Sequence, residues 1–117
     1  MSVHELVANP LRFDGKVVRT IGFLSLEAEN VALYPSEDAY DHMTPDAIWV
    51  ELSPRELEAH SALARRYVVI KAIYRAGPKG HFGAYAGQLE QIADLRPTLS
   101  RKEVEKLTAV PPPPPPP

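Results

Sequence analysis

Apolar and polar residues alternate along this chain with two different periods, and the pattern predicts short helices separated by strands. Serine followed three residues later by glutamate, which is the spacing of a capping box, occurs three times, at Ser2, Ser53 and Ser100. Because a capping box marks the first turn of a helix, these serines predict helices at Val3–Asn9, Pro54–Arg66 and Arg101–Ala109.

Segments rich in β-branched and aromatic residues predict strands at Lys16–Glu27, Val31–Tyr34, Ala47–Leu52, Tyr67–Ala76 and Tyr85–Leu95. In the first segment the apolar phase changes at Gly22, which predicts a bulge that bends a long strand. In the third segment, Ile48 and Val50 share one face of the strand and Trp49 faces the other way. Trp49 is therefore a candidate for an exposed aromatic side chain.

The predicted order of three strands, a helix and two strands resembles the OB fold, a small five-stranded Greek-key barrel. The resemblance covers residues 14–97 and rests on three stretches, DGKVVRTIGFL, IWVEL with its capped helix, and YVVIKAIYRAGPKGHFGAYAGQLEQIADL. These stretches look like the tRNA-anticodon-binding-like OB domains of small bacterial proteins. The predicted fold class is mainly β, with a helix between strands three and four and an N-terminal helix. An SH3-like barrel is the alternative, and the capped helix favours the OB-like one.

Composition limits the chain to one small domain. Of its 117 residues 44% are hydrophobic, none is cysteine, and seven of the 13 prolines form the run Pro111–Pro117. We expect residues 1–99 to form the barrel domain and residues 100–117 to form a short helix with a flexible polyproline tail. No apolar run approaches the about 20 residues that a membrane span needs. The absence of cysteine fits a reducing compartment, so the expected localisation is cytoplasmic.

Charge is distributed unevenly along the chain, although the net charge is only −2. Residues 26–60 contain nine acidic side chains and one basic one, whereas residues 61–83 contain five basic side chains and none that is acidic. The resemblance to the OB fold implies that a ligand contacts the loop between strands four and five and the face of strands two and three. The predicted ligand- or partner-binding residues combine aromatic and basic groups and are Trp49, Lys71, Arg75, Lys79, His81 and Phe82.

Motifs for catalysis or cofactors are missing from the sequence. The glycine-rich segment GPKGHFG has neither the Gly-Lys-Ser/Thr ending of a P-loop nor the GxGxxG spacing. Asp38, Asp41 and His42 are chemically suited to a metal, but their spacing matches no EF-hand or HExxH motif. We therefore predict no enzyme activity, no catalytic residues, no cofactor and no metal.

These observations lead to a prediction of a small non-catalytic binding or adaptor module that contacts a protein or peptide partner. The first alternative is a weak binder of single-stranded nucleic acid through the same residues, which the negative net charge disfavours. The second is a metal-dependent enzyme centred on Asp38, Asp41, His42 and His81, which is the least favoured. The sequence does not predict the oligomeric state.

Overall fold

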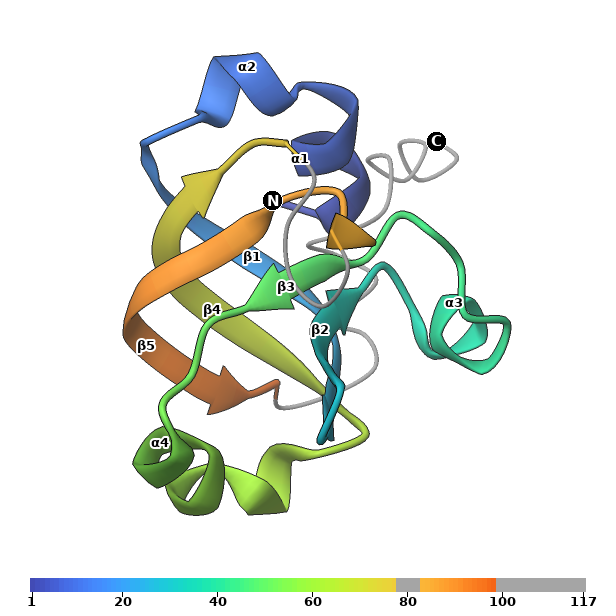
Figure 1. Ribbon diagram of the computed structural model, residues 1–117, viewed down its shortest axis with the longest axis vertical. Coiled ribbons are helices and arrows are strands. Elements are labelled where there is room, and N and C mark those ends of the chain that lie inside the picture. Colours follow the sequence, from blue (N-terminus) through green and yellow to red (C-terminus); the bar gives the residue numbers. More distant parts are fainter. Residues whose placement is uncertain (78–82, 99–117) are drawn as a thin grey trace, which may run out of the picture.

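The computed structural model describes residues 1–77 and 83–98 and shows a five-stranded closed barrel with short helices (Figure 1). The strands are β1 (Val17–Glu27), β2 (Asn30–Tyr34), β3 (Ile48–Val50), β4 (Arg66–Arg75) and β5 (Gln88–Pro97). The helices are α1 (Val3–Ala8), α2 (Pro10–Phe13), α3 (Glu37–Asp41), α4 (Pro54–Ala59) and the 3-10 turn η1 (Ser61–Leu63). The predicted helix Arg101–Ala109 and the proline run lie outside the described residues.

The strands close in the order β1-β2-β3-β5-β4. Strand β1 pairs antiparallel with both β2 and β4, and its length of 11 residues lets it serve two neighbours. Strands β3 and β5 pair in parallel, while the other pairs are antiparallel. This mixed order, with α4 between β3 and β4, confirms the predicted OB-like barrel.

The predicted bulge at Gly22 is wrong. The β1–β4 register runs from Val17 opposite Ile73 to Leu24 opposite Arg66 without a shift. Gly22 is instead a point of close contact, because a Cβ at this position would lie 2.5 Å from the carbonyl oxygen of Tyr34. The irregularity in this sheet falls in the β4–β5 pair, where Gln91 adopts a φ of 51°.

The barrel interior is filled by alternate residues of every strand, and helices close its two ends (Figure 1). Val3 and Leu6 of α1 are fully buried in the core at one end, and Leu63 of η1 is buried at the other. The Ser53 capping box is confirmed, because Ser53 Oγ accepts from the Glu56 amide and the Glu56 carboxylate accepts from the Ser53 amide. The helix that it begins ends at Ala59, earlier than predicted, and the 3-10 turn η1 follows it. Arg65, with a φ of 59°, directly precedes β4.

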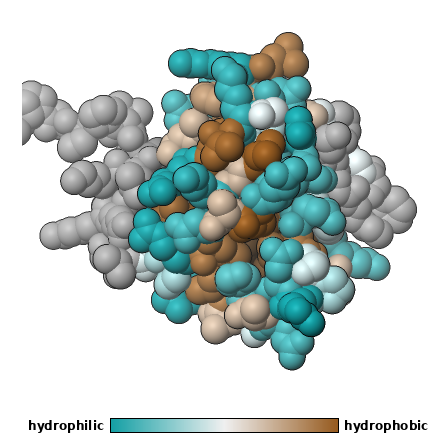
Figure 2. Space-filling model, turned by 90° about the vertical axis from the view of Figure 1, so that its left-hand side faces the viewer, coloured by the Kyte–Doolittle hydropathy of each residue, from teal (hydrophilic) through white to brown (hydrophobic). Residues whose placement is uncertain are grey.

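Apolar side chains also gather on part of the outer surface. Figure 2 shows them in the middle of the side on which β5 and β4 lie in Figure 1, with hydrophilic side chains around them. The outward-facing residues of the sheet include Val17, which is 62% exposed, and its cross-strand neighbour Ile73.

In the described part of the chain, no helix is long and apolar enough to cross a membrane.

Candidate functional site

Two of the residues predicted to bind a partner meet in one row across the outer face of the barrel. Trp49 on β3 lies opposite Gln88 in the parallel β3–β5 pair, and Arg75 on β4 lies opposite the same Gln88 in the antiparallel β4–β5 pair. Since neighbouring strands lie about 4.8 Å apart, the backbones of Trp49 and Arg75 are about 10 Å apart. We call Trp49, Gln88 and Arg75 the Trp49 row.

Trp49 is half-buried and is held by contacts on two sides. Its ring lies 5.2 Å from that of Tyr85 between centroids, with an angle of 62° between the ring planes. Its indole Nε1–H donates to Glu51 Oε2 at 2.9 Å, two residues along the chain. The indole is thus held in a defined orientation, with a carboxylate at its polar edge.

Arg75 already has a partner within the barrel. Its Nε donates to Glu90 Oε1 at 2.9 Å, and the two side chains are 44% and 26% exposed. Because this ion pair compensates the guanidinium charge, Arg75 offers less to an incoming phosphate than a free arginine would. Arg75 therefore also holds β4 to β5 through its ion pair with Glu90.

Lys71 lies outside the row. It sits four residues before Arg75 on the same outer face of β4, about 13 Å away along the strand. Its cross-strand neighbours are Arg19 on β1 and Asp94 on β5. The other predicted contact residues, Lys79, His81 and Phe82, lie outside the described residues.

A continuous belt of aromatic side chains, which the sequence did not predict, runs over the outer faces of β4, β1 and β2 toward Trp49. Successive ring centroids are 5.3 Å apart from Tyr67 to Phe23, 5.3 Å from Phe23 to Tyr40 and 5.5 Å from Tyr40 to Tyr34. We call these four residues the aromatic belt. The sequence signal for it was the apolar run Val31–Tyr34, because a strand that is apolar on both faces is covered on both faces. All five residues of β2 are buried.

Asn30 connects the aromatic belt to the Trp49 row. Its Oδ1 accepts from the Tyr85 hydroxyl at 2.7 Å and from the Tyr34 hydroxyl at 3.2 Å. The side chain is 7% exposed, and its Nδ2 finds no acceptor among the described residues. Two tyrosines from distant parts of the chain are therefore fixed by one buried amide.

The tyrosines here act as neutral hydrogen-bond donors. Burial, and secondarily Tyr34 and Glu27, raise the pKa of Tyr85. A hydrogen bond to the Glu27 carboxylate is the main cause that raises the pKa of Tyr40. Raised phenol pKa values keep both hydroxyls protonated at neutral pH, which suits a binding surface and makes neither residue a ready base.

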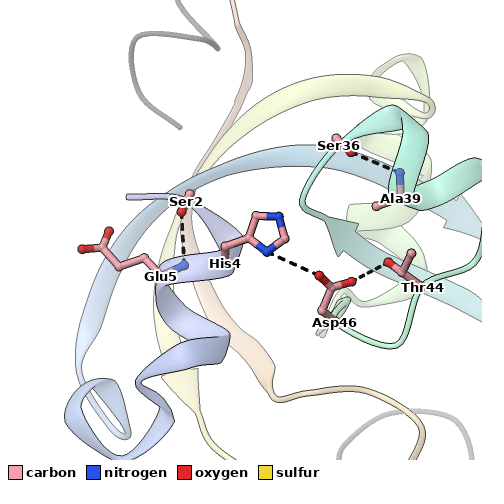
Figure 3. A network of polar contacts seen from close by, with 7 residues as sticks. All are labelled: Ser2, His4, Glu5, Ser36, Ala39, Thr44 and Asp46. Carbon is pink, nitrogen blue, oxygen red and sulfur yellow. Dashed lines mark hydrogen bonds and ion pairs between the residues drawn. The ribbon is translucent and has the colours of Figure 1, made fainter. Parts of the chain in front are cut away.

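Helix α3 covers the aromatic belt. It begins after Ser36, whose Oγ accepts from the Ala39 amide at 3.1 Å, and Ala39 is buried against the belt. The loop that follows is tied to α1, because His4 Nδ1 lies 3.4 Å from Asp46 Oδ2 and Asp46 also accepts from Thr44 (Figure 3). The protein itself thus covers much of the aromatic belt, with Phe23 and Tyr34 buried and Tyr40 and Tyr67 half-buried.

The described residues contain no group of three or more His, Asp or Glu side chains arranged to hold a metal ion. Asp38 and His42 do lie together, with His42 Nδ1 3.5 Å from Asp38 Oδ1, on an exposed part of α3. The contact with Asp38 raises the pKa of His42. This pair is the local i, i+4 contact of a helix end.

Comparison of the chain with protein-family models, curated proteins and solved structures finds no match. The class defined by the fold is a small mainly β barrel with the OB-like strand order.

Proposed function

We propose that this chain is a non-catalytic binding module that contacts a protein or peptide through the Trp49 row and Tyr85. The observation that carries the proposal is the Trp49–Tyr85 pair on the outer face of the barrel. Tryptophan and tyrosine bury large areas with few rotatable bonds, and they are enriched among the residues that dominate binding energy. A half-buried tryptophan with a fixed orientation is already organised for such a contact.

The charges near this pair favour a protein partner over nucleic acid. The indole N–H is held by Glu51, Glu27 contributes to the raised pKa of Tyr85, and Arg75 is neutralised by Glu90. Carboxylates at the surface repel phosphates, whereas they attract lysine and arginine side chains. The ligand expected here therefore presents apolar or basic groups.

The orientation of the Trp49 and Tyr85 rings also favours a protein partner over nucleic acid. Base stacking needs an open aromatic face. The planes of the Trp49 and Tyr85 rings lie at 62° to each other, so the edge of one ring covers part of the face of the other. Single-stranded nucleic acid is the runner-up, because Trp49 lies on β3, a strand that OB folds use for oligonucleotides.

Nuclear magnetic resonance of the ¹⁵N-labelled full chain tests this proposal, since Trp49 is the only tryptophan and gives one indole signal. The probes are a pool of basic and apolar dodecapeptides and the oligonucleotide dT12, each titrated at low and at physiological salt. We expect the peptide pool to shift the indole signal and the amides of Gln88 and Tyr85. Stronger shifts with dT12 that vanish as salt rises would overturn the proposal in favour of nucleic acid.

Two charge-removing variants sharpen the result. Glu51→Gln removes the carboxylate beside the indole and should weaken a basic peptide several-fold. Glu58→Gln removes an exposed carboxylate on α4 and serves as the matched control, with no expected effect on the peptide. Equal loss in both variants would show that only the overall charge matters, and would contradict a contact at the Trp49 row.

A further inference from the structure

We propose that the ligand class of this surface is a polyproline II helix and that its occupant is Pro111–Pro117 of the same chain. The inference rests on the proposed function and adds the identity of the ligand. Seven consecutive prolines favour polyproline II, a rigid helix that loses little entropy on docking. Such segments are recognised by closely spaced aromatic side chains, and Trp49 and Tyr85 are such a pair.

The hydrogen-bonding groups of the surface match what polyproline offers. Prolyl carbonyls accept hydrogen bonds, but a proline run has no N–H to donate. The surface must therefore supply donors, and Gln88 lies beside Trp49 in the row. Within residues 1–77 and 83–98, the Gln88 side-chain amide has no other partner. Its amide N–H groups and the indole N–H of Trp49 are the donors that we assign to prolyl carbonyls.

Charge supports docking of this particular segment. The residues between the barrel and the prolines carry a net charge of +1, because they include three cations, Arg101, Lys102 and Lys106, and two acids, Glu103 and Glu105. The row is flanked by two carboxylates, Glu51 and Glu90. A cation of the segment that pairs with Glu51 would release the indole N–H, which Glu51 now holds, to a prolyl carbonyl. The hydrogen bond between the indole and Glu51 would thus be replaced by two contacts, an ion pair with Glu51 and a hydrogen bond from the indole to a prolyl carbonyl.

The length of the chain allows the segment to reach the row. Strand β5 starts at Gln88 in the row and ends at Pro97, so the chain must return over about 30 Å at most. The 12 residues 99–110 span about 40 Å if extended. If residues 101–109 form the helix that the sequence predicts, they contribute about 14 Å and the remaining three about 10 Å. The proline run adds about 22 Å, so it crosses the row in either case.

The test uses the full chain and a full-length variant with the seven substitutions Pro111→Ser through Pro117→Ser. We expect the indole signal of Trp49 to differ between them, at a position that does not change over a tenfold range of protein concentration. Added heptaproline peptide should bind the serine variant and return the indole signal toward its position in the unsubstituted chain. Gln88→Ala in the serine variant should weaken heptaproline by about tenfold, which corresponds to the loss of about one hydrogen bond.

A matched control is the double substitution Thr108→Ser and Ala109→Ser, which changes the segment before the prolines and should leave the indole signal unchanged. An identical indole signal in the serine variant, with no response to millimolar heptaproline, would overturn the inference. A shift that grows with protein concentration would assign the prolines to a second copy and would overturn the assignment to the same chain.

The outcome separates this inference from the proposed function. If the basic peptide pool shifts the Trp49 row and heptaproline does not, the proposed function stands and the polyproline assignment fails. If neither probe shifts it, both fail.

Discussion

The Tyr85 hydroxyl donates a hydrogen bond of 2.7 Å to Asn30 Oδ1, across 55 positions of sequence. Tyr34 donates to the same oxygen, so one buried amide fixes two rings of the outer surface. Tyr85 in turn contacts Trp49, and Asn30 therefore sets the geometry of the candidate contact surface from beneath.

Asn30→Ala should destabilise the protein by about 1–3 kcal/mol, because it removes the shorter hydrogen bond of each tyrosine hydroxyl. Among the described residues, Tyr85 keeps only its contact with the Glu29 carbonyl at 3.4 Å, and Tyr34 only that with Met43 Sδ at 3.9 Å. Urea unfolding measures the loss. Asn9→Ala is the control and should cost about 0.5 kcal/mol, since Asn9 Nδ2 donates to the exposed Glu5 carbonyl at 3.0 Å. Equal losses in the two variants would contradict a special role for the buried amide.

Gly22→Ala should destabilise the barrel by about 3 kcal/mol or more, because the new Cβ would lie 2.5 Å from a backbone oxygen and 2.7 Å from Leu33 Cγ. The expected decrease in Tm is more than about 10 °C. Gly77→Ala separates crowding from backbone strain. A Cβ there would meet no described residue within 4 Å, but its φ of 101° should cost about 1–2 kcal/mol. A larger decrease in Tm for Gly77→Ala than for Gly22→Ala would refute the packing argument.

Much of the fold was predictable from local sequence. The alternation of Ile48, Trp49 and Val50 fixed which residue of β3 faces outward, and the capping-box spacing at Ser2 and Ser53 marked the starts of α1 and α4. The full box forms at Ser53, whereas at Ser2 the serine side chain alone caps the helix. These features depend on neighbours within four residues. Helix α3 was missed because Ser36 is followed at the third position by Ala39, which cannot complete a capping box.

Other features depend on contacts between distant segments and were not predictable. The change of apolar phase between Ile21 and Leu24 predicts a bulge at Gly22. In the structure both faces of β1 are covered from Thr20 to Ser25, and Ile21 and Phe23 are buried on the outer side of the barrel. The Trp49 row arises from the parallel β3–β5 register, which joins residues 39 positions apart (88 minus 49). Periodicity fixes which face of the sheet a residue occupies. It does not specify which residue of β5 lies opposite Trp49.

Ser53→Ala should cost about 1 kcal/mol, because it removes the side-chain half of the capping box of α4. Thermal unfolding by circular dichroism measures the change. Ser61→Ala is the control, since Ser61 begins η1 in an exposed position and η1 has no side-chain cap. A decrease in Tm for Ser61→Ala as large as that for Ser53→Ala would contradict the role of the cap.

The capping box of α4 also predicts that the stability of the protein decreases in acid. The hydrogen bond from the Ser53 backbone N–H, and then that with the Ser53 side chain, lower the pKa of Glu56 from 4.5. A lowered folded pKa means that the ionised carboxylate stabilises the fold above pH 4.5 and that this contribution is lost as pH falls through the folded pKa. Glu56→Gln should lack that acid-dependent loss, and a variant that loses stability in acid in parallel with the unsubstituted chain would contradict the prediction.

Alkaline pH should destabilise the barrel through its buried tyrosines. Burial, followed by the charge of Asp14, raises the pKa of Tyr74, and burial is also the first cause for Tyr85. A folded pKa above 10.0 favours the neutral phenol, so the stabilisation is complete below pH 10 and is lost as pH rises through the folded pKa. Absorbance at 295 nm should therefore show tyrosines that ionise later than free tyrosine. Tyr85→Phe should remove one late ionisation and leave that of Tyr74, whose hydroxyl donates to the Ala86 carbonyl at 2.9 Å. If the chain, while still folded by circular dichroism, ionised its tyrosines in a single step near pH 10, the environments assigned to Tyr74 and Tyr85 would be wrong.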